Sequence, residues 1–176
     1  MADAPIVTAR LRLRPLHPLH DAAAMLALLN DPGFLSGIGD RGVRTEAQAR
    51  DYLHDWAAEH RARHGFAHWA VETHAGEFIG SAGLLCKEGL PLPHVGYALL
   101  SGQHGRGYAE EATRAVLRHA REVLGLRHLC AIVDPGNTAS IRLLEKLGLQ
   151  REGARVLSPG TPALLYYTLD LHAPRD

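Results

Sequence analysis

The sequence predicts an α/β fold in which about seven strands and about four helices form one domain over residues 1–176. Segments with strand periodicity are interleaved with segments of helical periodicity, and no repeat or low-complexity stretch interrupts them. A glycine-rich turn at 103–107 joins a predicted strand directly to a predicted helix. With 176 residues, of which 46% are apolar, the chain is long enough to bury a core of ordinary size.

The first half of the chain combines helices with a predicted hairpin. Leu alternates with Arg over residues 8–14, and this period of two predicts a strand whose wet face carries Arg10, Arg12 and Arg14. Thr45 suits the N-cap of a helix, and His74-Ala75-Gly76 suits a hairpin turn. The elements predicted here are a strand at 8–14, helices at 21–29 and 45–63 separated by a glycine-rich loop at 33–42, and strands at about 66–73 and 77–86.

The second half alternates strands with helices. Ala109, Ala112, Val116 and Ala120 recur at spacings of three and four, which gives the helix after the turn one apolar stripe. Gly96, inside the strand before the turn, suggests a bulge or a splayed edge. The elements predicted here are a strand at 95–100, a helix at 108–124, a strand at 129–133, a helix from Asn137 or Thr138 to Gly148, and two strands around 158–162.

The turn before the helix at 108–124 has the chemistry of an anion-binding site. The first N–H groups of a helix have no intrahelical partners and carry a partial positive charge, so a phosphate placed there satisfies both. Gly105 and Gly107 lack a Cβ, which lets the backbone take left-handed conformations and approach a ligand closely. Arg106 adds a formal positive charge between them.

The glycine spacing separates three ligand classes that bind at such a turn. A P-loop ends in Gly-Lys-Ser/Thr, which is absent here, and a dinucleotide fingerprint needs a small residue where this chain has Glu110. What remains is the pattern Arg/Gln-x-x-Gly-x-Gly/Ala, with which acetyl-CoA-dependent N-acetyltransferases hold the pyrophosphate of coenzyme A. Gly105, Gly107 and Ala109 fit this pattern, and His104 stands in place of its usual first residue.

The chain therefore resembles the GNAT superfamily, in particular the branch of RimJ/RimL-type ribosomal-protein N-terminal acetyltransferases. Besides the turn, the resemblance rests on the segments at 8–14, 78–84, 95–97, 111–112 and 133–148. It implies a mixed central sheet with splayed strands at the acetyl-CoA site, acetyl-CoA as cosubstrate and an amine as acceptor. The cofactor-binding residues that it implies are Leu99, Leu100, His104, Gly105, Arg106, Gly107, Tyr108, Ala109, Asn137 and Ser140.

Amine acetylation needs a proton acceptor for the amine and a stabiliser for the tetrahedral oxyanion. In the resembled family, a backbone N–H on the strand before the turn stabilises the oxyanion, and Leu99 or a neighbour holds that place here. The family often has Glu where this chain has His94, and a histidine with a pKa of about 6.5 can accept a proton at neutral pH. Alternatively, His94 is a solvated loop residue, and a carboxylate elsewhere or bulk water serves as the proton acceptor.

The leaving thiolate needs a proton or a hydrogen bond. Many GNAT enzymes place a tyrosine on the helix after the Asn motif, but Leu144 stands at that position and leaves the role vacant. In the RimJ/RimL branch a serine of the Asn-x-x-Ser turn lies near the thioester sulfur, and Ser140 matches it; otherwise Ser140 only bonds its own helix turn. Asn137 resembles the CoA-contacting Asn of the family, and it also suits a helix cap.

Composition narrows the partners. A formal net charge of zero and a pI of about 7.2 give no electrostatic case for nucleic acid or an anionic membrane. No apolar run approaches about 20 residues, and the first residues lack the pattern of a signal peptide, so we expect a cytoplasmic location. The expected partners are acetyl-CoA and an amine acceptor, either a protein N-terminus or a small molecule, and a homodimer stays open.

No metal is predicted. His60 and His64 are four residues apart, as metal ligands can be, but no third ligand lies nearby in the sequence, and a solvated helix end explains them. Cys86 and Cys130 lie in apolar strand-like runs, which favours free buried thiols over a disulfide. Two function classes stay open: an acetyl-CoA-dependent N-acetyltransferase that moves acetyl directly to an amine, and a non-catalytic acyl-CoA-binding module on the same fold.

Overall fold

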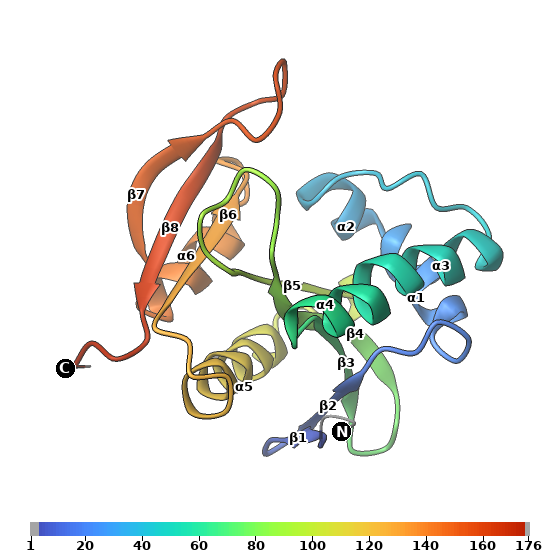
Figure 1. Ribbon diagram of the computed structural model, residues 1–176. Coiled ribbons are helices and arrows are strands. Elements are labelled where there is room, and N and C mark those ends of the chain that lie inside the picture. The colour runs from blue at the N-terminus through green and yellow to red at the C-terminus, as the bar shows by residue number, and fades with distance from the viewer. Residues whose placement is uncertain (1–3, 175–176) are drawn as a thin grey trace.

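Eight strands form one sheet in the part of the chain that the structure describes, residues 4–174 (Figure 1). In this computed structural model they lie in the order β1-β2-β3-β4-β5-β6-β8-β7. The sheet is mixed because β5 and β6 run parallel, whereas the other neighbours run antiparallel. The strands are β1 (Ile6–Val7), β2 (Leu11–Pro15), β3 (His68–Thr73), β4 (Phe78–Leu85), β5 (His94–Leu99), β6 (His128–Val133), β7 (Gln150–Arg155) and β8 (Leu164–Asp170).

The predicted mixed α/β fold is confirmed, with one strand more than expected. The extra strand is β1, which pairs Ile6 with Leu13 and Val7 with Arg12 at the edge of the sheet. Two residues are too few to show a period of two in the sequence. The predicted hairpin at residues 66–86 is present as β3 and β4.

The second predicted helix begins at the cap that the sequence indicates. Thr45 caps the second predicted helix through its hydroxyl, which accepts from the Gln48 N–H, and the Gln48 side chain completes a capping box. This helix changes to a π-helical segment at His54–Glu59, which its sequence period did not indicate. The helices are α1 (Ala22–Leu29), α2 (Pro32–Gly37), α3 (Glu46–Leu53), α4 (His60–His64), α5 (Tyr108–Glu122) and α6 (Thr138–Lys146).

The expected loop at 33–42 is helical in its first part. Asp31 accepts a hydrogen bond from the Gly33 N–H and Pro32 stands at the first helical position, so α2 starts in spite of its glycines. Within residues 4–174, no helix has both the length and the apolar character to cross a membrane.

The expected wet face of β2 is only partly wet. Arg14 forms ion pairs with Asp21 at 2.8 Å and Glu72 at 3.1 Å, and Arg10 reaches across to α5. Burial raises the pKa of Asp21, but the bonds from Arg14 and from the His17 N–H outweigh it and bring that pKa below its usual value. The alternation of Leu with Arg thus predicted the strand correctly, while its charged side chains fasten β2 to the neighbouring elements.

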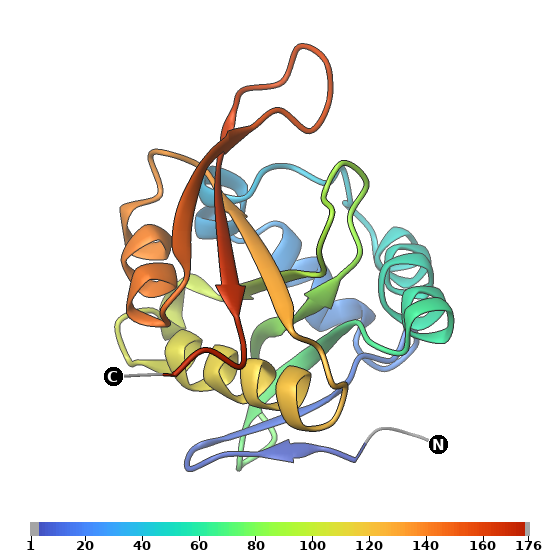
Figure 2. The ribbon, with the colours of Figure 1, turned by 60° about the vertical axis from the view of Figure 1, so that its left-hand side comes forward.

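Helices cover both faces of the sheet (Figures 1 and 2). On one face α5 packs its apolar stripe, including Ala112 and Val116, over the buried side chains of the central strands. On the other face α1 and α3 form a second cluster with Phe34 of α2 and Ala70 of β3. Burial of such side chains stabilises the fold by about 1.5–3 kcal/mol for each large aliphatic residue, so the two layers fix the sheet between them.

The sheet opens between β5 and β6. Their one Cα pairing in the ladder is His94 with Cys130, where the Cys130 N–H donates to the Pro93 carbonyl at 2.9 Å. Beyond that point the two strands separate, which confirms the expected splay. Gly96 is not a bulge, because β4 and β5 pair without interruption from Gly80 with Leu99 to Leu85 with His94.

Candidate active site

A cavity of about 1070 Å³ lies where β5 and β6 separate. One end is lined by the glycine turn, the first turn of α5 and the start of α6. The rest of the lining comes from other elements, including α1, α2 and the segment that follows β4, and α2 also comes close to the glycine turn, because a Cβ at Gly33 would lie 3.3 Å from His104 Cε1. Ligand pockets usually measure about 300–1,000 Å³, so the cavity has room for a cofactor and an acceptor together.

The glycine turn has the predicted form. Gly105 and Gly107 have φ angles of 75° and 78°, a left-handed conformation that favours glycine. Gly107 is the N-cap residue of α5, and no side chain caps this helix, in contrast to α3 and α6. The first N–H groups of α5 are therefore open to an anionic ligand.

Arg10 holds the turn from outside the cavity. Its Nη1 donates to the Arg106 carbonyl at 2.8 Å, and its Nε lies 3.2 Å from Glu111. The Arg10 guanidinium also lies over the Tyr108 ring, 4.5 Å from its centre. These contacts give the turn a fixed shape without using the N–H groups at the start of α5.

The last residues of β5 lie beside the turn. His104 Nε2 bonds the Leu99 carbonyl at 3.0 Å, so the neutral ring carries its proton on that nitrogen and offers only Nδ1 as an acceptor. The Leu100 N–H donates to the Ile79 carbonyl, which makes Gly80 and Leu99 a non-hydrogen-bonded pair. The Leu99 N–H consequently points away from β4, toward the opening.

A tyrosine and a serine meet at the start of α6. The Tyr97 hydroxyl of β5 lies 2.7 Å from the Ser140 hydroxyl. Asn137 caps α6 because its Oδ1 accepts from the Ser140 N–H at 3.2 Å. Burial raises the pKa of Tyr97, so its phenol is protonated at neutral pH and can donate to Ser140.

Two histidines lie on the opposite face of β5. His68 of β3, Gly83 of β4 and Gly96 of β5 are cross-strand neighbours, so their side-chain positions share one face with that of His94. A Cβ at Gly96 would lie 3.2 Å from His94 Cε1 and 3.4 Å from His68 Nε2. The absence of that Cβ leaves room for both imidazole rings.

Both rings have a buried nitrogen without a hydrogen bond from the described residues. These atoms are His94 Nδ1 and His68 Nε2, while His68 Nδ1 lies 3.3 Å from the Ser81 hydroxyl. Buried polar atoms of this kind usually have a partner, and here a bound ligand or water can supply it. The two atoms therefore give this part of the cavity polar groups that a ligand can bind.

Burial, with the charge of Lys87 as a smaller cause, lowers the pKa of His94 to about 4. Burial and then the neighbouring His94 lower the pKa of His68 to about 3. Both rings are therefore neutral at pH 7. The value for His94 corrects the ordinary histidine pKa that the sequence led us to expect.

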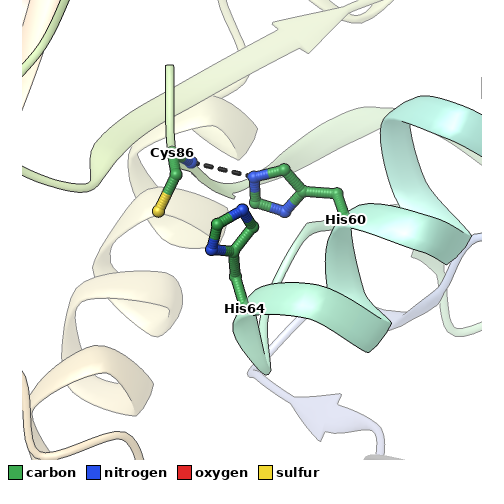
Figure 3. A group of neighbouring side chains, drawn as sticks. All are labelled: His60, His64 and Cys86. Atoms are coloured by element: carbon green, nitrogen blue, oxygen red, sulfur yellow. Dashed lines mark hydrogen bonds between the residues drawn. The ribbon is translucent and has the colours of Figure 1, made fainter. Parts of the chain in front are cut away.

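His60, His64 and Cys86 form a cluster (Figure 3), in which His60 and Cys86 line the cavity. The third candidate ligand that the sequence did not indicate is Cys86, which stands at the end of β4 and is exposed rather than buried. His60 Nδ1 bonds the Phe66 carbonyl at 2.8 Å, and its Nε2 accepts from the Cys86 N–H at 2.9 Å. His60 thus has no free lone pair for a metal.

Sequence reasoning missed two of the residues in the cavity. Tyr97 belongs to the segment 95–97, but the resemblance places the proton-donating tyrosine on α6 and gives Tyr97 no role. His68 is one histidine among twelve. Gly83 and Gly96 could have indicated His68, since a glycine inside a strand often marks a close approach. Their common register with His68 becomes visible only once the strands are paired.

Comparison with known proteins identifies the family of this arrangement. Residues 10–150 match the family described as Acetyltransferase (GNAT) domain. An uncharacterized N-acetyltransferase, p20 of Bacillus licheniformis, is 31% identical over 152 residues, which cover 84% of this chain and 83% of that protein.

Two solved structures share the fold. An acetyltransferase from Agrobacterium tumefaciens str. C58 superposes with a TM-score of 0.79 at 27% identity, covering 96% of this chain and 95% of the other. Mycobacterium smegmatis RimJ in complex with CoA-disulfide superposes with a TM-score of 0.75 at 25% identity, covering 91% and 81%. The second match supports the RimJ/RimL-like branch that the sequence indicated.

Proposed function

The chain belongs to the GNAT family of acetyltransferases, and on that basis we propose that it transfers acetyl from acetyl-CoA directly to an amine within a ternary complex. Membership decides against the non-catalytic binding module, because this family and the named relative are acetyltransferases. The observation that carries the proposal is the open start of α5 beside the separation of β5 and β6. A helix start without a side-chain cap and a gap in the sheet lie next to each other there.

Acetyl-CoA is proposed to bind with its pyrophosphate at the glycine turn. The N–H groups from Gly105 to Ala109 and the charge of Arg106 would face the phosphates, and His104 would complete the turn. The pantetheine would then follow β5 past Leu99 and Leu100, and Asn137 would contact it through the amide nitrogen that its capping bond leaves available. This path ends at the opening between the strands.

The Leu99 N–H is proposed to stabilise the oxyanion. It points into the opening, away from β4. A backbone donor fixed by a strand is already oriented when the thioester carbonyl becomes tetrahedral, which is how such donors accelerate acyl transfer.

His94 is proposed as the proton acceptor, directly or through a water. A pKa of about 4 makes the ring a weak base for a free ammonium group, so the amine has to react in its neutral form. As the amine nitrogen bonds the acetyl carbon, its N–H becomes acidic, and the neutral ring can take that proton. The buried and unpaired Nδ1 supports this role.

Ser140 is proposed to donate to the leaving sulfur, with Tyr97 behind it. The amine loses one proton, the carbon–sulfur bond breaks, and the thiolate takes the Ser140 hydroxyl proton. Tyr97 then donates to Ser140 across the 2.7 Å contact and recovers its proton from solvent, while His94 releases to solvent the proton that it took from the amine. The products are the N-acetylated amine and CoA, which balances the reaction.

Thermal unfolding with acetyl-CoA tests the cofactor assignment. Acetyl-CoA and CoA are expected to raise the Tm, whereas NAD and ATP should do little. Gly107→Val strains a left-handed residue and brings a Cβ within 3.3 Å of Arg10, so it should abolish the response. Gly76→Val is the matched control, because Gly76 has a φ of 85° in the β3–β4 turn away from the cavity.

Both variants should lower the Tm through backbone strain, but only Gly107→Val should lose the shift with acetyl-CoA. No shift for the wild-type protein at millimolar acetyl-CoA, or an equal shift for Gly107→Val, would contradict the assignment.

A further inference from the structure

The part of the cavity around His68 and His94, called the acceptor end below, contains two cations without an anionic partner. Lys87 and Arg41 both line it, and no ion pair within residues 4–174 includes either of them. Six of the other cations lie against carboxylates: Arg10 with Glu111, Arg14 with Asp21 and Glu72, Arg44 with Asp40, Arg114 and Lys146 with Glu110, and Arg121 with Glu122. Exposed arginines such as Arg63 and Arg118 also have no ion pair among the described residues, but they do not line this cavity.

Arg41 lies against the wall of the cavity. Its guanidinium carbon is 6.0 Å from the centre of the Phe34 ring, and its Nη1 is 3.8 Å from the place of a Cβ on Gly39. Phe34 and Gly39 both line the cavity. The guanidinium thus stays beside the acceptor end although the residue as a whole is exposed.

Lys87 lines the same cavity as Arg41 and the two histidines. It follows two residues after Leu85, the strand partner of His94, and its side chain is partly buried. Burial and then the charge of Arg41 lower the pKa of Lys87, and Lys87 in turn lowers that of His94. Such mutual effects require the three groups to be near one another.

The carboxylates of the cavity do not neutralise these cations. Glu110 is engaged by Arg114 at 2.9 Å and Lys146 at 2.8 Å at the cofactor end, and Asp134 accepts from the Gly136 N–H at 2.7 Å. Glu88 is exposed at the rim and forms no ion pair within the described chain. Since His68 and His94 are neutral, the acceptor end carries uncompensated positive charge, and a partly buried ammonium group is stabilised by an anion.

We propose that the acceptor is an amine that carries a carboxylate, which Lys87 and Arg41 bind while the amine lies beside His94 and His68. The proposal deepens and rests on the proposed acetyl transfer, whose bond changes at the amine are as written above. The carboxylate fixes the position of the amine, and the neutral histidines do not repel it. A free amino acid and the acidic first residue of a peptide both offer this chemistry.

Matched pairs of acid and amide test the proposal. The kcat/KM for alanine is compared with that for alaninamide, which lacks the α-carboxylate, and C-terminally amidated peptides that begin with Glu are compared with the same peptides beginning with Gln. The acid of a pair is expected to react at least about tenfold better, mainly through a lower KM for the acceptor, since bonds to ionised groups are the stronger ones. A preference among the free amino acids, among the peptides or in both identifies which source the site uses.

Lys87→Gln should remove most of this preference, Lys87→Arg should keep it, and Arg41→Gln should reduce it, with the response to acetyl-CoA unchanged. Arg50→Gln is the control, because Arg50 is an exposed arginine of α3 outside the cavity and should leave every rate unchanged. Equal rates for acid and amide in the wild-type protein, or an undiminished preference in Lys87→Gln, would overturn the proposal.

Calorimetry on the CoA-loaded protein separates this proposal from the acetyl transfer itself. N-acetylalanine should bind at least about tenfold more tightly than N-acetylalaninamide, and Lys87→Gln should equalise the two. Tighter binding of the acid without any transfer would support the anion site and contradict the enzyme activity. Acetyl transfer with equal binding of acid and amide would support the enzyme activity and contradict the anion site.

Discussion

At the scale of single residues, the site depends on groups whose protonation is set by burial. His94 and His68 lie on one face of β5 with pKa values lowered to about 4 and about 3, and Tyr97 lies on the other face with a raised pKa. At neutral pH the imidazoles can accept a proton and the phenol can donate one. β5 therefore presents a proton acceptor on one face and a proton donor on the other, beside its separation from β6.

The pH dependence of kcat/KM tests His94. Its folded pKa lies below that of an ordinary histidine, so kcat/KM per neutral amine should stay level down to about pH 5 and fall through about pH 4. His94→Ala should lower the rate at pH 7 by about 10²–10⁴ and remove this limb. His172→Ala, at an exposed histidine near the C-terminus, is the control.

Repeating the profile with an acceptor of different pKa shows whether the limb belongs to the substrate. If His94→Ala keeps more than about a third of the rate with its acid limb in place, His94 is a bystander. A wild-type limb between pH 6 and 7 would contradict the environment described here.

Ser140 and Tyr97 are tested as a pair. Ser140→Ala and Tyr97→Phe should each lower turnover and leave the affinity for acetyl-CoA within a few-fold, because both act on the leaving group. The double variant should be little worse than the more damaging single variant, since the hydroxyls are in direct contact at 2.7 Å. Unchanged turnover with a stability loss of about 1 kcal/mol in Ser140→Ala would leave Ser140 a structural role only.

At the scale of elements, two helix starts face the same cavity with different chemistry. α5 begins at a glycine with no side-chain cap, while α6 is capped by Asn137. The start of α2 is fastened to the segment between β5 and the glycine turn, because the Asp31 carboxylate accepts from the Ser101 N–H at 3.0 Å and the Gly33 N–H at 2.9 Å. The Asp31 carboxylate thus joins the start of α2 to the residues that follow β5.

Two substitutions of Asn137 separate its cap from its proposed contact with CoA. Asn137→Ala removes the acceptor of the Ser140 N–H and should lower the free energy of unfolding by about 1 kcal/mol. Asn137→Asp keeps that acceptor and should retain the stability, yet it lacks the amide nitrogen and should weaken acetyl-CoA binding. Chemical denaturation and calorimetry check the two expectations, and full affinity in Asn137→Asp would restrict Asn137 to capping.

At the scale of the whole molecule, the sequence predicted what depends on neighbours in the chain. The glycine turn, the caps at Thr45 and Asn137 and the apolar stripe of α5 are local patterns, and the structure has all of them. The contact of Tyr97 with Ser140 joins residues 43 positions apart.

The remaining parts of the site depend on strand pairing. His68 reaches His94 only because β3, β4 and β5 pair in one particular register, and Cys86 meets His60 for a similar reason, at the end of β4. Register is set by the burial of whole strand faces, which single positions in the sequence do not reveal.

The size of the cavity also predicts that both substrates are bound when acetyl is transferred. Under the proposal, acceptor and acetyl-CoA occupy different parts of one cavity, so both would be bound at once. Cys86 is a poor nucleophile for a covalent acetyl-enzyme, because it lies at the rim of the cavity and its partial burial raises the pKa of the thiol.

Initial rates over a grid of acetyl-CoA and acceptor concentrations, followed by CoA release, test the central claim most directly. Direct transfer in a ternary complex predicts double-reciprocal lines that intersect, with CoA release that depends on the acceptor. Parallel lines, or acetyl found on the protein when the acceptor is omitted, would contradict it.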